Sequence, residues 1–170
     1  MRLSFVVILV AAAFFIGISV GTYFRSPAIE RAAGEVGVAS FVPVLGFTAV
    51  NATIRDTTVS LLGGCRAVQF DVTPDQAYSI AVATNNVSSE RPLGHDVFRE
   101  VMDNFGVKLL QANIDRHEAG VYKATMYMRR DNDVLAIDSR PSDAIAMAAR
   151  YKAPVLMKNE ILDQQGKNVC

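Results

Sequence analysis

Hydrophobic and polar side chains alternate most regularly over residues 121–130. An alternation with a period of two is typical of a β-strand with one buried and one exposed face. Apolar stretches at 107–116 and 134–138 flank this segment, and short polar turns separate them from it. The side chains expected on one face are Tyr122, Ala124, Met126 and Met128, and those on the other are Lys123, Thr125, Tyr127 and Arg129. We therefore predict a three-stranded antiparallel meander.

A helical repeat precedes the meander, over residues 92–105, and Gly106 ends it. Its apolar side chains recur at helical spacing on one face, which consists of Leu93, Val97, Phe98, Val101 and Phe105. The other face carries Asp96, Arg99, Glu100 and Asp103. His95 falls at the border of the two faces, so we expect its side chain to look into the rim of a cleft.

The rest of the pattern predicts further strands at 47–54, 58–62, 67–72 and 154–157. Thr73 and Gln76 have the spacing of a capping box, which predicts a helix from there to about residue 84. Another helix is expected over 141–151, and a half-buried turn near Ile161 and Leu162. The expected fold class is α+β, a mostly antiparallel sheet with helices packed on it.

The first part of the chain has a different character, because residues 3–24 contain no charged side chain. A helix of about 20 apolar residues spans a bilayer, so we predict one N-terminal transmembrane helix that acts as a signal anchor. A cleaved signal peptide is the alternative. The remaining chain would then be membrane-anchored on the exported side, or secreted after cleavage. We expect a linker at 25–45, one domain at 46–165 and a tail at 166–170.

The charge of the chain argues against one class of function. The 17 basic and 17 acidic side chains balance, and only one of them, Arg2, lies within residues 1–24. The rest of the chain is thus close to neutral, which argues against coating nucleic acid by bulk positive charge.

Cys65 and Cys170 are the only cysteines, and their spacing fits no zinc motif. We expect both to be incidental, with a disulfide as the alternative if the domain lies outside the cytosol.

Two matched runs of ionisable residues carry the candidate chemistry: Arg-Pro-Leu-Gly-His-Asp at 91–96 and Asp-Ser-Arg-Pro-Ser-Asp at 138–143. Each opens a predicted helix. A histidine titrates near neutral pH and can transfer protons, and carboxylates can bind Mg²⁺ or Mn²⁺. The catalytic candidates are His95, Asp96, Asp138 and Asp143, of which the three aspartates are also the candidate metal ligands. The phosphate-binding candidates are Arg91, Arg140 and Ser142.

Each candidate also has a purely structural interpretation, which for His95 is a hydrogen bond to a nearby backbone carbonyl. Asp96, Asp143 and Ser142 suit the first turn of a helix, where they stabilise its N-terminus. Arg140 suits an ion pair with Asp138 or Asp143. Helix capping explains Asp143 well but explains Asp138 poorly, so the pair slightly favours a functional role.

Three stretches carry a resemblance to a known family: residues 91–96, residues 138–146 and the later Ala153-Pro154-Val155. Over residues 46–165 the chain resembles the bifunctional nuclease domain family. The resemblance implies the family's fold and a nuclease activity on DNA, RNA or both. We therefore expect a membrane-tethered nuclease with nucleic acid as substrate, a divalent metal cofactor and a capacity to form homo-oligomers. The alternative is a non-catalytic binding or assembly module on the same fold. The sequence has no glycine-rich phosphate loop, nucleophile elbow, zincin motif or Cys-x-x-Cys, so nucleotide triphosphatase, serine hydrolase and zinc protease classes lack support.

Overall fold

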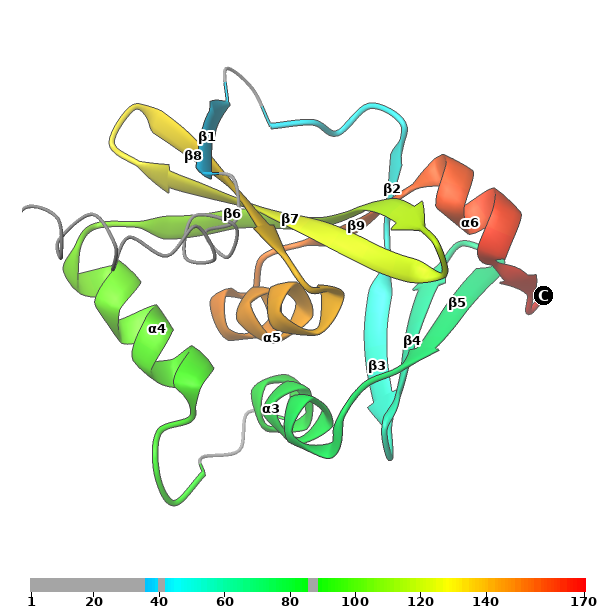
Figure 1. Ribbon diagram of the computed structural model, residues 1–170, viewed down its shortest axis with the longest axis horizontal. Coiled ribbons are helices and arrows are strands. Elements are labelled where there is room, and N and C mark those ends of the chain that lie inside the picture. Colours follow the sequence, from blue (N-terminus) through cyan, green and yellow to red (C-terminus); the bar gives the residue numbers. More distant parts are fainter. Residues whose placement is uncertain (1–35, 40–41, 86–88) are drawn as a thin grey trace, which may run out of the picture. The chain divides into compact units, whose positions relative to one another are not determined.

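The computed structural model describes residues 36–39, 42–85 and 89–170, whose strands form two sheets (Figure 1). The larger sheet contains β1 (Val36–Ala39), β2 (Phe47–Ala49), β6 (Lys108–Glu118), β7 (Val121–Arg130), β8 (Asp133–Ser139) and β9 (Val155–Lys158), in the order β1-β8-β7-β6-β9-β2. The smaller sheet contains β3 (Asn51–Arg55), β4 (Thr58–Gly63), β5 (Arg66–Asp71) and β10 (Lys167–Asn168), in the order β10-β5-β4-β3. The helices are α3 (Pro74–Thr84), α4 (Gly94–Asn104), α5 (Pro141–Tyr151) and α6 (Asn159–Gln165).

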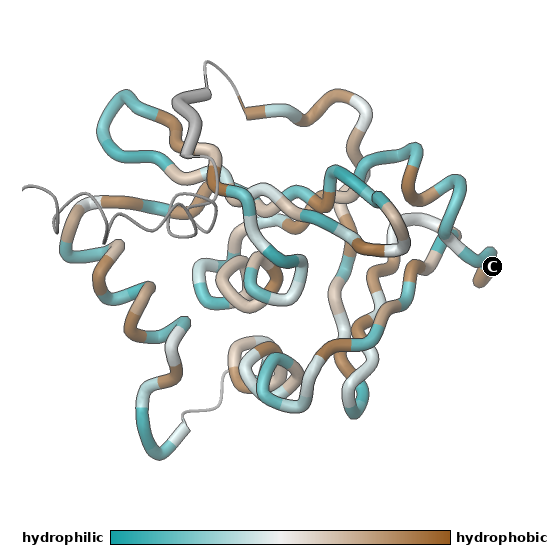
Figure 2. The backbone as a smooth tube through the Cα atoms, viewed as in Figure 1, coloured by the Kyte–Doolittle hydropathy of each residue, from teal (hydrophilic) through white to brown (hydrophobic). Residues whose placement is uncertain are grey.

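The predicted α+β class is confirmed, and β6, β7 and β8 form the predicted antiparallel meander. Figure 2 shows the hydrophilic turn that joins β7 to β8. One pair departs from the antiparallel pattern, because β9 runs parallel to β6, with Ala112 opposite Val155. A parallel return needs a crossover connection, which α5 supplies between β8 and β9.

Two shorter elements differ from the sequence predictions. The single strand expected at 47–54 is divided at the buried Val50, so that β2 pairs with β9 in one sheet and β3 pairs with β4 in the other. The half-buried turn expected near Ile161 and Leu162 is the helix α6, in which both side chains are buried. In each case pairing and burial against distant segments decide the local conformation.

Helix α5 is the central element of the domain, since it lies between the larger sheet and α3 (Figure 1). It spans Pro141–Tyr151, as predicted, with proline at its first position and Arg140 as its extended N-cap. The five residues Ala144–Ala148 are almost completely buried. Three of them are alanines, whose small side chains allow α5 to approach both neighbouring layers closely.

Helix α4 is oriented against its own amphipathic pattern. Its apolar face is largely exposed, with exposures of 39–67% at Val97, Phe98, Val101 and Phe105. Of the residues within α4, Met102 alone is buried, and the charged flank faces α5. Figure 2 shows hydrophilic and hydrophobic residues alternating along this helix. The helix begins at Gly94, two residues later than predicted, because Leu93 is in an extended conformation.

The cysteines are not incidental, and that prediction was wrong. Cys65, in the turn between β4 and β5, forms a disulfide with Cys170 across 105 residues of sequence. The C-terminal segment reaches Cys65 because β10 pairs with β5 and the Val169 N–H donates to the Cys65 carbonyl. Long sequence separation concealed this proximity.

Replacing both Cys65 and Cys170 with serine is expected to lower the free energy of unfolding by about 2–5 kcal/mol, because the disulfide restricts the unfolded chain. Urea denaturation of the purified protein, with and without dithiothreitol, measures the change. The reductant should destabilise the wild type and leave the double variant unaffected. A loss below about 0.5 kcal/mol would show that the bond contributes little.

The predicted transmembrane helix at 3–24 lies outside the described residues, so the anchor stays a prediction. Among the helices of the described ranges, none has the length and hydropathy of a membrane span. Residues 36–39 of the expected linker form β1, which pairs antiparallel with β8. The Pro43 carbonyl, also in that segment, accepts hydrogen bonds from the Gln111 and Asn113 side chains.

Candidate active site

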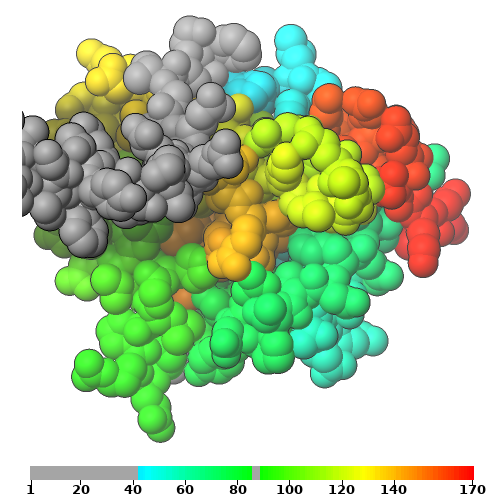
Figure 3. All heavy atoms as spheres, viewed as in Figure 1, coloured from blue at the N-terminus to red at the C-terminus, as the bar shows by residue number. Residues whose placement is uncertain are grey.

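The N-terminal ends of α4 and α5 line one cavity of about 680 Å³. The two runs of ionisable residues noted in the sequence therefore contribute to a common site. His95 comes from the first turn of α4, and Arg140 and Asp143 come from the start of α5. Helix α3 contributes Tyr78 and Ser79 to the wall, and β7 contributes Met126. In Figure 3 the orange atoms of the α5 region reach the surface between the green atoms of α3 and α4.

His95 is held at both ring nitrogens. Its Nε2 lies 3.2 Å from Asp143 Oδ1, and its Nδ1 lies 2.8 Å from the Ser79 hydroxyl oxygen. The His95 and Asp143 side chains are 22% and 23% exposed, so the pair is shielded but reachable from solvent. The imidazole is therefore fixed in orientation by groups from two other helices.

Asp143 also binds Arg140, whose Nε and Nη2 donate to its two carboxylate oxygens at 2.6 Å and 3.1 Å. Burial alone would raise the pKa of Asp143, but the hydrogen bonds from His95 and Arg140 outweigh burial and lower it. Asp143 is thus ionised at neutral pH and can only accept hydrogen bonds. In the neutral imidazole, Nε2 must then carry the proton, and Nδ1 accepts the proton of the Ser79 hydroxyl.

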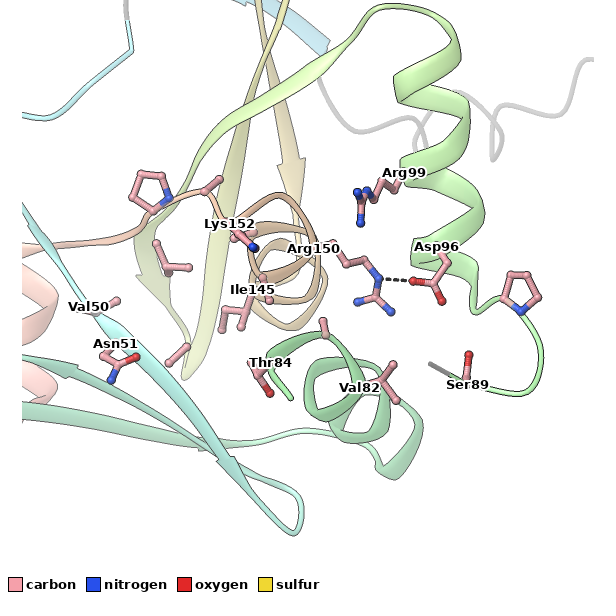
Figure 4. A pocket seen from close by; sticks show the side chains of 18 residues that line it. Val50, Asn51, Val82, Thr84, Ser89, Asp96, Arg99, Ile145, Arg150 and Lys152 are labelled. Carbon is pink, nitrogen blue, oxygen red and sulfur yellow. Dashed lines mark hydrogen bonds and ion pairs between the residues drawn. The ribbon is translucent and has the colours of Figure 1, made fainter. Parts of the chain in front are cut away.

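Asp96 faces a different cavity, of about 1170 Å³, where it is bound to Arg150 (Figure 4). Arg150 Nε donates to Asp96 Oδ1 at 2.6 Å, and the Leu93 N–H donates to Asp96 Oδ2 at 2.9 Å. The hydrogen bond from Arg150 is the main cause of a lowered Asp96 pKa. Arg150 Nη1 also donates to the carbonyls of Ser79 and Ala146. Asp96 and Arg150 therefore connect α3, α4 and α5.

Asp138 is separated from the cavity by the larger sheet. It is opposite Thr125 in the β7–β8 register, so it lies on the face away from Ala124 and Met126. Met126 lines the cavity, whereas Asp138 accepts a hydrogen bond from Arg116 Nη2 at 2.6 Å. Both members of this pair are more than 40% exposed.

The three candidate metal ligands, Asp96, Asp138 and Asp143, are therefore not assembled in one place and do not fit a shared metal site. Arginines bind all three carboxylates. Over the described ranges, no group of three or more His, Cys, Asp or Glu side chains is placed to hold a metal ion.

The phosphate-binding candidates also separate. Arg140 lines the cavity and is 68% exposed, which leaves part of its guanidinium available to a ligand. Arg91 is exposed in the segment before α4, and its carbonyl accepts a hydrogen bond from Ser89. Ser142 is buried within α5. Neither of these two is among the described residues that line the cavity.

Two important residues escaped the sequence predictions. Ser79 lies inside a helix and belongs to no motif, so its sequence context gave no signal of its contact with His95. Arg150 lies in the last turn of α5, where a positively charged side chain usually extends into solvent and stabilises the helix C-terminus. Its side chain is instead only 3% exposed.

Comparisons with known proteins add information on ancestry. Residues 63–169 match the model of the bifunctional nuclease domain. The chain is 28% identical over 103 residues to an uncharacterized protein of Mycobacterium tuberculosis, with 61% of each protein covered. It is 32% and 30% identical over 95 residues to bifunctional nucleases 2 and 1 of Arabidopsis thaliana, covering 53% of this chain and 28% and 29% of those proteins. The chain therefore spans less than two thirds of the length of these relatives.

Proposed function

Because the chain belongs to the bifunctional nuclease domain family, we propose that it hydrolyses phosphodiester bonds of DNA, RNA or both in the cavity that contains His95. The family match agrees with the resemblance inferred from residues 91–96 and 138–146. One observation carries the assignment of the site. The His95 imidazole is hydrogen-bonded to an ionised Asp143 in a solvent-connected cavity, beside the exposed guanidinium of Arg140.

Phosphodiester hydrolysis needs proton transfer to and from oxygen atoms and a positive group beside the phosphate. His95 moves the proton. Asp143 orients the ring and stabilises the imidazolium that forms, as a carboxylate does when it accepts the histidine N–H. Arg140 holds a nonbridging phosphate oxygen through donors that Asp143 does not occupy. General acid–base catalysis of this kind contributes roughly 10²–10⁴ in rate.

Requirement for a divalent ion stays a prediction, and no step above depends on one. A nuclease assay should therefore have three arms, with Mg²⁺, with Mn²⁺ and with EDTA.

We further propose that the domain acts on the exported side of a membrane and is tethered through residues 3–24. The disulfide between Cys65 and Cys170 supports an oxidising compartment, because such bonds are rare in the cytosol.

A non-catalytic binding module is the second candidate, and the arginine partners of Asp96 and Asp138 favour it. In that case the aspartates organise the helices and the sheet. The two candidates differ in their response to substrate. A binding module retains oligonucleotides unchanged, whereas the enzyme releases shortened products with time.

Replacing Asp143 with asparagine is expected to lower the cleavage rate at least about 10²-fold, because the imidazolium loses its anionic partner. Asp138→Asn is the matched control, and its rate should stay within about threefold, since Asp138 lies across the sheet from the cavity. End-labelled single- and double-stranded DNA and RNA oligonucleotides serve as substrates for the full-length protein. Equal losses in the two variants would indicate that the carboxylates act together, against the site proposed above.

A further inference from the structure

We infer that Ser79 is a nucleophile that His95 activates, so that cleavage proceeds through a covalent intermediate on the Ser79 oxygen. This inference rests on the proposed function, because it assigns the attacking atom in the same cavity. It adds a residue from α3 to a site that the sequence placed only on α4 and α5.

The first argument is the hydrogen bonding of the imidazole. Asp143 occupies Nε2 of His95 and Ser79 occupies Nδ1, so the hydroxyl of Ser79 is the proton source nearest to the basic nitrogen. A water could be activated directly only if one of these bonds first broke. With both bonds intact, the proton that His95 accepts is that of Ser79.

The second argument is geometric. Activated nucleophiles are recognised by a hydroxyl within hydrogen-bond reach of a base that a third group orients. The Ser79 oxygen lies 2.8 Å from His95 Nδ1, and Asp143 lies 3.2 Å from the opposite nitrogen. The order of groups is that of a Ser-His-Asp triad, which occurs on unrelated folds and in varied sequence orders.

The third argument is the way Ser79 is held. Ser79 is buried, yet it lines the same cavity as Arg140 and Asp143. Its carbonyl accepts a hydrogen bond from Nη1 of the buried Arg150 at 3.1 Å. The backbone is thus fixed from the side of α5, while the hydroxyl is directed at His95. A serine that served only the helix would bond a backbone carbonyl within its own helix instead.

The reaction balances with water as the only co-reactant. The Ser79 oxygen bonds to phosphorus while its proton passes to His95 Nδ1, and the bond from phosphorus to one ester oxygen breaks. That oxygen leaves with the proton from His95. Water then attacks the serine-bound phosphorus and gives a proton to His95, which returns it to the Ser79 oxygen as that oxygen leaves. The products are an alcohol and a phosphate monoester, and Arg140 neutralises charge on the phosphoryl oxygens.

An alkyl fluorophosphonate tests the nucleophile without relying on nucleic acid, because an activated serine bonds to its phosphorus and fluoride leaves. The full-length protein is treated with the reagent, and the modified peptide is mapped by mass spectrometry. We expect label on Ser79, at a rate that falls about 10²–10⁴-fold in His95→Ala. Ser79→Ala should take no label and lose oligonucleotide cleavage. The control is Ser60→Ala, on β4, which should still be labelled on Ser79 and should still cleave oligonucleotides.

Each outcome separates this inference from the proposed function. Oligonucleotide cleavage within threefold of wild type in a folded Ser79→Ala variant would overturn the inference and leave the nuclease assignment intact. Labelling of Ser79 that is independent of His95 would also overturn it. Labelling of Ser79 with no cleavage of any oligonucleotide by wild type would support the activated serine and reject the nuclease assignment.

Discussion

Replacing His95 with alanine is expected to lower the rate of oligonucleotide cleavage by about 10²–10⁴-fold. His95 is the only histidine among the described residues that line the cavity, so the variant loses the group that accepts and returns the proton. Asp143 would keep its two hydrogen bonds from Arg140, so the start of α5 should stay folded. Initial rates at saturating substrate, with the variant and wild type purified in parallel, measure the loss.

His117→Ala is the matched control, because the chain has only two histidines. His117 lies near the end of β6, where it stacks on Tyr122 with ring centroids 4.3 Å apart, and it does not line the described cavity. Its replacement should leave the cleavage rate within about threefold of wild type. A similar loss in both histidine variants would point to unfolding or to a different site.

Replacing Arg150 with methionine is expected to lower the free energy of unfolding by about 2–4 kcal/mol, because removing one member of a buried ion pair leaves the other uncompensated. This effect is slightly below the usual range of about 3–5 kcal/mol, since Asp96 is one third exposed. The substitution also removes donors to the Ser79 and Ala146 carbonyls. Urea denaturation at pH 7 gives the change.

The contribution of the Asp96–Arg150 pair to stability depends on pH. The folded-state pKa of Asp96 is lowered, so the stability that this carboxylate contributes is present above its unfolded pKa of about 3.9 and is lost as pH falls through the folded value. The difference between wild type and Arg150→Met should therefore shrink when the pH is lowered from 7 to about 3. Arg116→Met, which removes the exposed partner of Asp138, should cost less than about 1 kcal/mol. An equal cost for the two arginines would contradict the buried role of Arg150.

Most elements of the fold follow from local sequence signals. The alternation of β7, the capping box at Thr73 and the proline that begins α5 each act over a few residues, and the structure has all three. The division of the strand at Val50 could not be predicted, because β2 pairs with β9, more than a hundred residues away in the sequence, whereas β3 pairs with the next strand, β4. The disulfide was concealed for the same reason.

The candidate site was predictable in part. The motifs identified His95, Arg140 and Asp143 because ionisable groups at helix starts are visible in sequence. They could not show that Asp138 points to the other face of the sheet, since a shift of one residue along a strand reverses the face. Nor could they show Ser79 beside His95, because that contact depends on how α3 and α4 pack around α5.

Chemical rescue tests whether His95 transfers the proton during phosphodiester cleavage. The rate of oligonucleotide cleavage is measured for wild type and His95→Gly across a series of imidazole concentrations. We predict that wild type cleaves and ignores imidazole, and that the variant is inactive alone but recovers part of the rate as imidazole fills the vacated space. Cleavage by His95→Gly at the wild-type rate without imidazole would contradict the proton transfer by His95. A wild type that cleaves no substrate with Mg²⁺, Mn²⁺ or EDTA would contradict the nuclease function.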